Sequence, residues 1–361
     1  MRRLHAIIPD SVPDQLRPSG GNTYDQRLLD GLDSLGWSVA EHLLPGAWPD
    51  PDAASRRALE DVAAGLPAGE TVLVDGLIAS NSPGVLVPLA HRVPLVVLVH
   101  LPVEGQRERA VLDAAAAVLT TSAWTRDRLL ALYRLDPRRV HVAEPGVDLS
   151  PVAPGTTAGG ELLCVAAVTP IKGHDLLVAA LATLRDLPWR CTCAGPLAPD
   201  PGFVEHVTAQ AHRAGIQDQV QLVGPLDRTA LDQAYAAADA IVHPSRVETY
   251  GMVVTEALAR GLPVIGTSVG GLPAALGHGA VDDAHDAGED GRPGLLVPAD
   301  DAAALAAALR AWLTDPALRE RLRHRARERR LSLHPWSRTA EQVSAVLATL
   351  VRTSAAGAEP D

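Results

Sequence analysis

Two glutamates on either side of a glycine are the first candidates for chemistry in this chain. Glu248 and Glu256 flank Gly251, between an apolar run at 236–242 that predicts a buried strand and a segment at 252–260 that predicts a helix. The start of such a helix presents unpaired backbone N–H groups, which favour a phosphate. Carboxylates would repel a phosphate, but they accept hydrogen bonds from neighbouring hydroxyl groups. A phosphate together with a polyol indicates a nucleotide sugar.

A lysine marks a second place where a phosphate could bind. Lys172 and Gly173 follow an apolar run at 162–168 and precede a predicted helix at 174–184. A lysine at the mouth of a strand–helix unit can reach a phosphate as a point charge. Considered alone, the same pattern is also typical of a solvated lysine at the start of a helix.

Two further candidate binding features lie in the first half of the chain. Gly20 and Gly21 lie before a predicted helix, where glycines allow a backbone to approach a ligand closely, but they do not form a G-x-G-x-x-G dinucleotide fingerprint. His100 ends an apolar strand, and polar residues at the carboxyl ends of parallel strands lie over the crevice where ligands bind. We rank His100 above His243, which ends a later strand.

Alternating strands and helices must position these residues. Apolar runs bounded by turn residues alternate with helical patterns, which predicts parallel, doubly wound sheets. A stretch rich in Pro, Gly, Thr and Ala at 150–160 is interpreted as a linker between two domains. The predicted strands are 4–8, 71–74, 95–100, 118–121 and 140–143 before the linker, and 162–168, 189–194, 220–223, 240–242, 263–266 and 294–297 after it.

Composition limits the classes of protein to which the chain can belong. Its 361 residues suit two α/β domains, and a net charge of −11 argues against nucleic acid as a partner. Three cysteines indicate buried, reduced thiols rather than a disulfide framework. No apolar stretch reaches the ~20 residues of a membrane span, and the run at 4–8 is too short for a signal peptide. We therefore expect a soluble, cytoplasmic protein, whose oligomeric state the sequence does not indicate.

The segment HPSRVETYGMVVTEALARGLPVIGTSVGG, at 243–271, resembles the nucleotide-sugar site of the retaining glycosyltransferases of family 4. That family has the GT-B fold, in which two Rossmann-like, doubly wound α/β domains face a central cleft. The resemblance is dense over 165–297 and thinner but collinear before it. It implies an acceptor-binding domain at 1–152, a nucleotide-sugar-binding domain at 153–335, a helix at 336–352 that packs back on the first domain, and a disordered tail at 353–361.

The resemblance also implies roles for single residues of the second domain. Glu256 would hold the ribose hydroxyls of the donor, and Glu248 would face the transferred sugar. The backbone amides of Gly251, Met252 and Val253 would lie near the diphosphate or the sugar.

Three more residues are assigned in the same way. Lys172 would bind the diphosphate, Gly21 would lie beside the sugar and the diphosphate, and His100 would lie near the donor sugar. The resemblance thus implies a catalytic set of Lys172, Glu248 and His100.

The chain departs from the pattern of the family at one phosphate ligand. Relatives usually carry an arginine five residues before the lysine, where this chain has Ala167. Arg246 could replace that charge, although a solvated arginine is the simpler interpretation. An arginine-rich run at 319–330 could contact acidic lipids, but glutamates are interspersed and we expect a solvated helix.

The predicted reaction is transfer of a sugar, expected to be a hexose, from a nucleoside diphosphate sugar to an unidentified acceptor, with retention of the anomeric configuration. No Asp-x-Asp or His-rich ligand set lies near the site, so we expect no metal and no cofactor apart from the donor substrate. Three alternatives stay open: another GT-B class such as a sugar-nucleotide epimerase or a phosphorylase, a nucleotide-sugar-binding module without turnover, and a dehydrogenase, which the poor glycine fingerprint disfavours.

Overall fold

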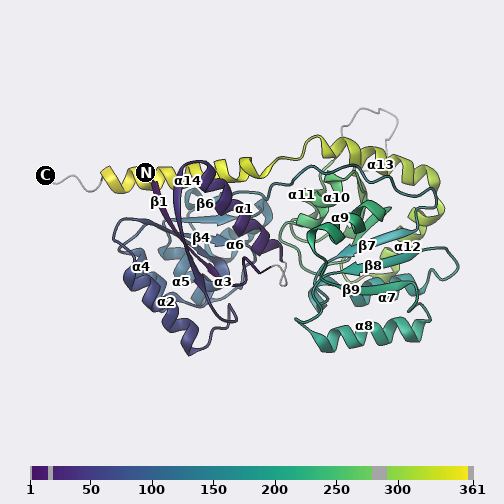
Figure 1. The fold of residues 1–361 in the computed structure, drawn as a ribbon, viewed down its shortest axis with the longest axis horizontal. Helices are drawn as coiled ribbons and strands as arrows, with labels where there is room; N and C mark the ends of the chain where they lie inside the picture. Colours follow the sequence, from purple (N-terminus) through teal and green to yellow (C-terminus); the bar gives the residue numbers. More distant parts are fainter. Residues whose placement is uncertain (1, 15–18, 279–290, 357–361) are drawn as a thin grey trace. The chain divides into compact units, whose positions relative to one another are not determined.

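The computed structural model describes residues 2–14, 19–278 and 291–356, and these residues form two compact units. Unit 1 contains the described residues up to Gly146 and the segment that begins at Pro335, and unit 2 contains residues 147–334. Each unit has one six-stranded sheet with helices on both faces (Figure 1).

The sheet of unit 1 has the strand order β2-β1-β3-β4-β5-β6, and its strands are parallel. The strands are β1 (Arg2–Pro9), β2 (Trp37–Leu44), β3 (Thr71–Asp75), β4 (Leu95–Val99), β5 (Ala117–Thr120) and β6 (Val140–Val142). The helices are α1 (Gly20–Ser34), α2 (Ala53–Gly65), α3 (Gly76–Ser80), α4 (Pro83–Ala90), α5 (Gln106–Ala114), α6 (Ala123–Tyr133), the short η1 (Pro137–Arg139) and α14 (Trp336–Ala356).

The strands of unit 1 are apolar because both faces of the sheet are covered. In β1, Leu4 and Ile8 lie in one buried cluster with residues of α1 and α14, whereas Ile7 lies in a second cluster with residues of α2 to α5. The edge strand β2 was not predicted from the sequence, because polar residues interrupt its apolar ones and its central residues are partly or fully exposed. Helix α14 runs past Arg352 to Ala356, so residues 353–356 are helical rather than part of a disordered tail; residues 357–361 lie outside the described residues.

The sheet of unit 2 has the strand order β12-β11-β10-β7-β8-β9 and is also parallel. The strands are β7 (Glu161–Val165), β8 (Arg190–Ala194), β9 (Val220–Gly224), β10 (Ala240–His243), β11 (Val264–Thr267) and β12 (Gly294–Val297). The helices are the short η2 (Pro170–Lys172), α7 (His174–Ala182), α8 (Pro201–Ala214), α9 (Arg228–Ala237), α10 (Met252–Ala259), α11 (Leu272–Leu276), α12 (Ala302–Thr314) and α13 (Pro316–Arg330).

Both sheets have a point where the order of strand addition reverses, between β1 and β3 in unit 1 and between β7 and β10 in unit 2. In open α/β sheets, ligands bind at the carboxyl ends of the strands at such a point. Gly21 follows β1, Lys172 follows β7 and Glu248 follows β10. The topology of each unit therefore brings predicted site residues to the edge where ligands bind.

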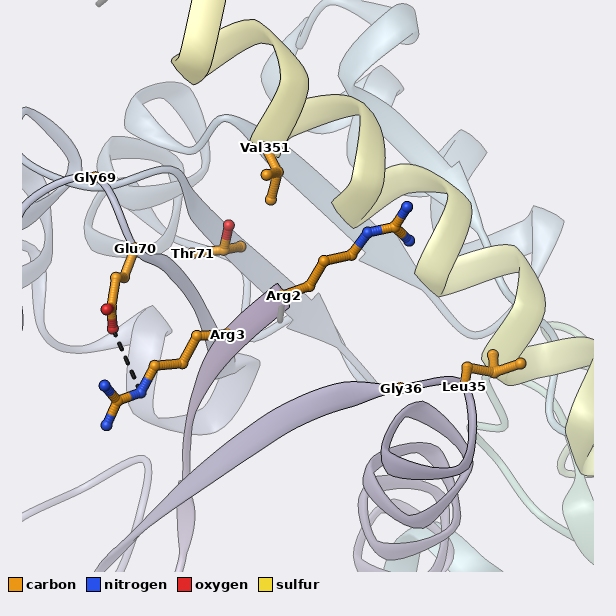
Figure 2. A pocket seen from close by; sticks show the side chains of 8 residues that line it. All are labelled: Arg2, Arg3, Leu35, Gly36, Gly69, Glu70, Thr71 and Val351. Carbon is orange, nitrogen blue, oxygen red and sulfur yellow. Dashed lines mark ion pairs between the residues drawn. The ribbon is translucent and has the colours of Figure 1, made fainter.

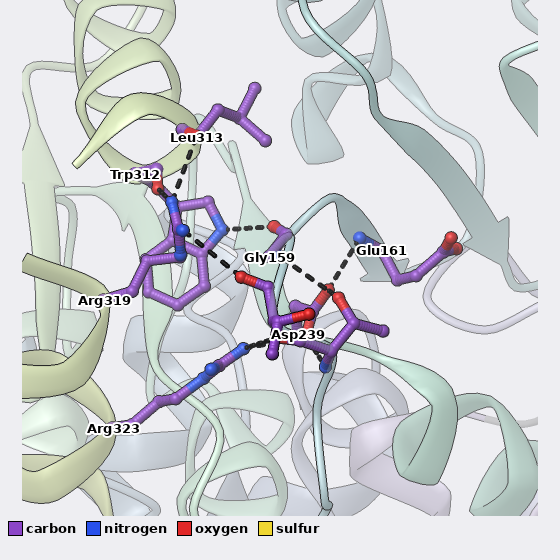
Figure 3. Close-up of polar contacts among 9 residues, drawn as sticks. Gly159, Glu161, Asp239, Trp312, Leu313, Arg319 and Arg323 are labelled. Carbon is purple, nitrogen blue, oxygen red and sulfur yellow. Dashed lines mark hydrogen bonds and ion pairs between the residues drawn. The ribbon is translucent and has the colours of Figure 1, made fainter. Parts of the chain in front are cut away.

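A fully buried aspartate holds the segment that the sequence indicates as a linker (Figure 3). Asp239 accepts hydrogen bonds from the backbone N–H and the hydroxyl of Thr156 and from the backbone N–H of Glu161. Arg323 donates to the same carboxylate at 2.8 Å. Residues 156–161 are therefore an ordered part of unit 2 and not a free tether.

The arginines of α13 correct the expectation of a solvated helix. Arg319 is 7% exposed and donates to the backbone oxygens of Trp312 and Leu313 (Figure 3). Arg330 donates to the backbone oxygen of Ala259 at 2.8 Å. These guanidinium groups satisfy carbonyls of unit 2 and are not a free basic face. In the described part of the chain, no helix has the length and apolar character needed to cross a membrane.

Candidate functional site

An ion pair lies at the carboxyl edge of the unit 2 sheet. Lys172 Nζ is 2.8 Å from Glu248 Oε2, and His243 Nε2 contacts the same oxygen at 3.0 Å. The Glu248 side chain is only 12% exposed. Burial alone would raise the pKa of this carboxyl, but the contacts with His243 and Lys172 outweigh it and lower the pKa. Glu248 is therefore an anion held between two basic groups.

The loops that carry this pair pack backbone against backbone. Gly173 has a φ of +71°, and a side chain there would overlap the carbonyl oxygen of Pro244. Gly270 has a φ of +55°, and a side chain there would overlap the carbonyl oxygen of Glu248, which accepts a hydrogen bond from the Gly271 N–H at 3.0 Å. Glycine is required at both positions by conformation and by space. The Gly-Gly turn after β11 thus supports the loop of Glu248.

Glu256 lies on α10 and has a different set of partners. The Tyr235 hydroxyl donates to Glu256 Oε2 at 2.8 Å, and burial raises the pKa of Glu256. Helix α10 begins at Met252, directly after Gly251. The N–H groups of Met252 and Val253 are in its first turn, where no earlier helical carbonyl can accept them. This helix start therefore offers backbone donors beside two acids.

Arg246 is neither a free phosphate ligand nor a solvated arginine. Its guanidinium donates to both carboxylate oxygens of Asp175 at 2.8 Å and to Asp300 at 2.5 Å. Its backbone N–H donates to the oxygen of Ile171 at 2.8 Å. Arg246 therefore ties the loop before Glu248 to the loop of Lys172, and its charge is already balanced. The structure gives it no position as a substitute for the arginine that Ala167 replaces.

In unit 1, His100 lies among two buried carboxylates. Its Nε2 is 2.7 Å from Asp25 Oδ1 and 3.6 Å from Asp75 Oδ2. Gly21 lies against the same ring, because a Cβ at this position would be 3.5 Å from His100 Cδ2. That distance is an ordinary contact, so unit 1 by itself leaves room for a methyl group at Gly21. The two residues predicted in this unit are thus neighbours in space.

The pKa values of this cluster are linked through its charges. Burial, and next the charge of Asp25, raise the pKa of Asp75 to about 7, against the effect of His100. Burial by itself would lower the pKa of His100, but Asp25 and Asp75 outweigh it and the net direction is upward. Near neutral pH the cluster therefore favours a protonated His100 and a partly protonated Asp75.

Sequence reasoning missed Asp25, Asp75 and Tyr235. Asp25 lies at the helical spacing of the buried residues Leu28, Leu29 and Leu32, so an acid on an apolar stripe was a readable signal. Asp75 ends the apolar strand β3, the same position that singled out His100 on β4. Tyr235 gave no such signal, because its contact with Glu256 joins two separate helices.

The buried cysteines do not form a convincing metal centre. Cys164 Sγ is 3.7 Å from His174 Nε2, and Cys164 and Cys193 face each other on β7 and β8. The contact with Cys193 and burial raise the pKa of Cys164, which favours a neutral thiol over the thiolate that a metal needs. These residues lie in the apolar core of unit 2, as the sequence suggests for reduced thiols.

A cavity of about 670 Å³ in unit 1 is separate from these clusters (Figure 2). It lies at the amino-terminal ends of β1 and β3, the edge of the sheet opposite to His100. Its lining residues are Arg2, Arg3, Leu35, Gly36, Gly69, Glu70, Thr71 and Val351. None of the predicted site residues is among them.

Two parallel, doubly wound units are the domains of the GT-B fold, and solved proteins with this fold match the chain, which confirms the predicted fold class. Sucrose-phosphate synthase from Thermosynechococcus elongatus has a TM-score of 0.78 and 23% identity, over 98% of this chain and 100% of that chain. HepE from Anabaena, solved with UDP and glucose, has a TM-score of 0.75 and 16% identity, over 97% of this chain and 100% of that chain. At these identities the likeness concerns the fold.

Sequence comparisons define the family. The model of group 1 glycosyl transferases matches residues 157–329, and that of Glycosyltransferase Family 4 matches residues 74–151. The D-inositol 3-phosphate glycosyltransferase of Kineococcus radiotolerans is 36% identical over 274 residues, 70% of this chain and 62% of the relative. D-inositol 3-phosphate glycosyltransferase 1 of Catenulispora acidiphila is 34% identical over 301 residues, which are 75% of this chain and 68% of that relative. This chain belongs to the family of these glycosyltransferases, and the predicted resemblance to glycosyltransferase family 4 is confirmed.

This chain matches only part of the length of these relatives. The chain spans 62%, 58% and 60% of the length of the relatives from Kineococcus radiotolerans, Jonesia denitrificans and Kribbella flavida.

Proposed function

We propose that this chain is a retaining glycosyltransferase that moves a sugar from a nucleoside diphosphate sugar to an acceptor hydroxyl, without a metal ion. The observation that carries the proposal is the ion pair of Lys172 and Glu248 at the reversal point of the unit 2 sheet. A cation for phosphate and an acid for sugar hydroxyls are next to each other there. Membership of a glycosyltransferase family supports the same reaction class.

Lys172 is the only lysine among the 32 Lys and Arg residues of the chain. A chain that uses arginine for every other cationic side chain keeps the compact ammonium group at this position. An ammonium group has three donors that can point in different directions, whereas a guanidinium is a planar fork. Lys172 can therefore contact Glu248 and a phosphate oxygen at the same time, which supports a role at the diphosphate.

The chemical step needs positive charge at the leaving group. The bond between the anomeric carbon and the diphosphate oxygen breaks, and the acceptor oxygen forms a bond to the same face of that carbon. The acceptor proton passes to the departing phosphate oxygen, so no separate general base is required. Lys172 and the N–H groups at the start of α10 would stabilise the departing charge. Glu256 would hold the ribose, and Glu248, Gly21 and His100 would contact the transferred sugar or the diphosphate.

A second candidate is a nucleotide-sugar-binding module without turnover. Ala167 supplies no charge where relatives usually have an arginine, and Arg246 is engaged by Asp175 and Asp300. Lys172 is then the cation that remains for the proposed phosphate position. Binding without transfer across a broad set of acceptors would favour this candidate.

The sole lysine permits a direct test. Biosynthetic labelling with ¹³C-lysine marks only Lys172 and keeps both its charge and its three N–H donors. UDP, GDP and ADP, and then their sugars, are titrated while the lysine signal and the thermal stability are followed. We expect one nucleotide both to stabilise the protein and to move the lysine signal. Stabilisation with an unmoved signal would place the nucleotide elsewhere, and stabilisation by NAD alone would favour a dehydrogenase.

Transfer is then assayed with the best donor. Products are identified by mass, and the configuration of the new bond by NMR. Inositol phosphates belong in the acceptor panel because relatives are named D-inositol 3-phosphate glycosyltransferases. A product with inverted anomeric configuration would overturn the retaining mechanism. If no metal takes part, the activity should be undiminished in the presence of a chelator. The three free, buried cysteines support a reducing, cytoplasmic environment for the reaction.

A further inference from the structure

We propose that Asp25, supported by Asp75, is a positioning residue that holds the His100 ring in one orientation, with Nδ1 as a hydrogen-bond donor toward the substrate. The proposal rests on the proposed function, since it names how His100 would be prepared for contact with the donor. It adds to that function two acids on separate elements, α1 and the end of β3, which sequence reasoning missed.

Both carboxylates contact the same nitrogen of the His100 ring. Both the 2.7 Å contact with Asp25 and the 3.6 Å contact with Asp75 are made to Nε2. The side chain of His100 is 17% exposed, whereas those of Asp25 and Asp75 are 2% and 4% exposed. Because Nε2 is directed at the buried acids, Nδ1 is the nitrogen that remains for a ligand.

Two of the groups around the ring, Asp75 and Tyr24, are themselves fixed. Asp75 Oδ1 accepts a hydrogen bond from the Leu77 N–H at 2.6 Å. The Tyr24 ring meets the His100 ring edge-on, with centroids 5.2 Å apart and planes at 77°. The Tyr24 hydroxyl donates to the Ala143 carbonyl at 2.8 Å, which anchors that ring in turn. A ring held on several sides by buried groups loses little freedom when a substrate binds.

The charges of the cluster decide what Nδ1 can do. A carboxylate at Nε2 requires a proton on that nitrogen. Two buried carboxylates beside one imidazole also favour the imidazolium form, which agrees with the upward direction of the His100 pKa. Nδ1 then carries a proton as well and donates to an oxygen of the substrate. Asp25 therefore acts through His100 and does not itself touch the substrate.

A purely structural role explains Asp25 poorly. The position lies on the apolar stripe of α1, and Asp25 is only 2% exposed. Burying a carboxylate is unfavourable unless it is paired, and a leucine at this spacing would pack against the same core. The acid is accounted for by its hydrogen bond to His100, which makes the orientation of that ring the property to test.

The test compares Asp25→Asn and Asp75→Asn with Asp30→Asn, an exposed acid on the same helix. Asparagine keeps the shape of the side chain but removes its charge. We expect Asp25→Asn to lower kcat roughly 10- to 100-fold, the effect of one charged hydrogen bond, with a smaller change in the donor KM. Its rate should fall at a lower pH on the alkaline side, because His100 loses its proton earlier. In a His100→Gln background, Asp25→Asn should have little further effect.

A readout without turnover separates this proposal from the proposed function. The ring nitrogens of His100 are followed by ¹H–¹⁵N NMR against pH in the free protein, with His100→Gln for assignment. We expect the pKa of His100 to be lower in Asp25→Asn and unchanged in Asp30→Asn. An unchanged titration in Asp25→Asn overturns the positioning role even if no transfer is found. Wild-type kcat in Asp25→Asn overturns it while leaving the transfer reaction intact.

Discussion

Lys172 Nζ lies 2.8 Å from Glu248 Oε2, so the only lysine of the chain already has an anionic partner in the free protein. His243 Nε2 contacts the same carboxylate oxygen at 3.0 Å. The pair keeps the ammonium group in place before a ligand arrives, which reduces the loss of side-chain freedom on binding. A diphosphate that joins this pair would add a second anion to Lys172 without displacing the first.

Replacement of Lys172 by alanine should lower the rate of sugar transfer by about 10²–10³, the usual effect of losing one preorganised donor at a developing charge. Lys172→Arg should also be impaired, because the longer, planar guanidinium cannot place its donors where the compact ammonium group lies beside Glu248. Steady-state kinetics with the best donor check both variants. Arg310→Ala removes a cation from the same unit at an exposed pair with Asp186 and should be neutral. Normal turnover in Lys172→Ala would contradict the proposed role.

Glu256→Ala should abolish discrimination between a ribonucleotide and its 2′-deoxy analogue. If Glu256 accepts hydrogen bonds from the ribose hydroxyls, the wild-type protein loses affinity for the nucleotide when a hydroxyl is removed. The variant already lacks this hydrogen bond, so its affinity should be the same for both nucleotides. Calorimetric titration with both nucleotides measures this difference. Tyr235→Phe, which removes the 2.8 Å hydrogen bond to Glu256, should show an intermediate effect. Equal discrimination in the wild type and in Glu256→Ala would place the ribose elsewhere.

Gly270→Ala should destabilise unit 2 and disturb the loop of Glu248. An alanine would have to adopt a φ of +55° and its Cβ would overlap the Glu248 carbonyl oxygen. The conformation alone costs roughly 1–2 kcal/mol, and the overlap adds to it. Gly84→Ala is the matched control, since a Cβ at Gly84 meets no atom within 4 Å. Urea unfolding of both variants should separate them, and equal stabilities would show that the turn tolerates a side chain.

The fold was predictable because its signals are local and repeated. Every strand predicted from an apolar run is present within a few residues of its expected bounds, since strands covered on both faces are apolar throughout. The edge strand β2 was missed for the opposite reason, because polar residues interrupt its apolar ones and leave no continuous apolar run. The order of strands in each sheet determines which loops meet, and it was available only through the resemblance to a known family.

The site was less predictable because its partners come from distant segments. Lys172, Glu248 and His100 were chosen by their places after strands, which sequence can show. Asp25 and His100 are 75 residues apart, and the pairing of Arg246 with Asp175 spans 71 residues. No spacing rule links such positions. For the same reason the arginines of α13 were taken for a solvated face, although Arg319 donates to carbonyls within unit 2.

The stability of unit 1 should depend on pH through Asp75. Its pKa is raised to about 7 in the folded protein, mainly by burial and then by the charge of Asp25. The folded state therefore binds the proton more tightly than the unfolded chain, whose carboxyl has a pKa of about 4. The stabilisation is fully present below about pH 4 and is lost as the pH rises to about 7. Asp75→Asn removes this loss, because asparagine stays neutral and can still accept from the Leu77 N–H.

The expected result is a stability difference that changes with pH. Asp75→Asn should gain on the wild type between pH 5 and pH 8.5, by at most roughly 3 kcal/mol in the free energy of unfolding. Urea unfolding at several pH values measures the gain, with Asp61→Asn as an exposed control on α2. A constant offset between Asp75→Asn and the wild type across this range would show that Asp75 stays ionised in the folded protein. His100 would then face a fixed negative charge at Asp75, and its own proton would be held still more tightly.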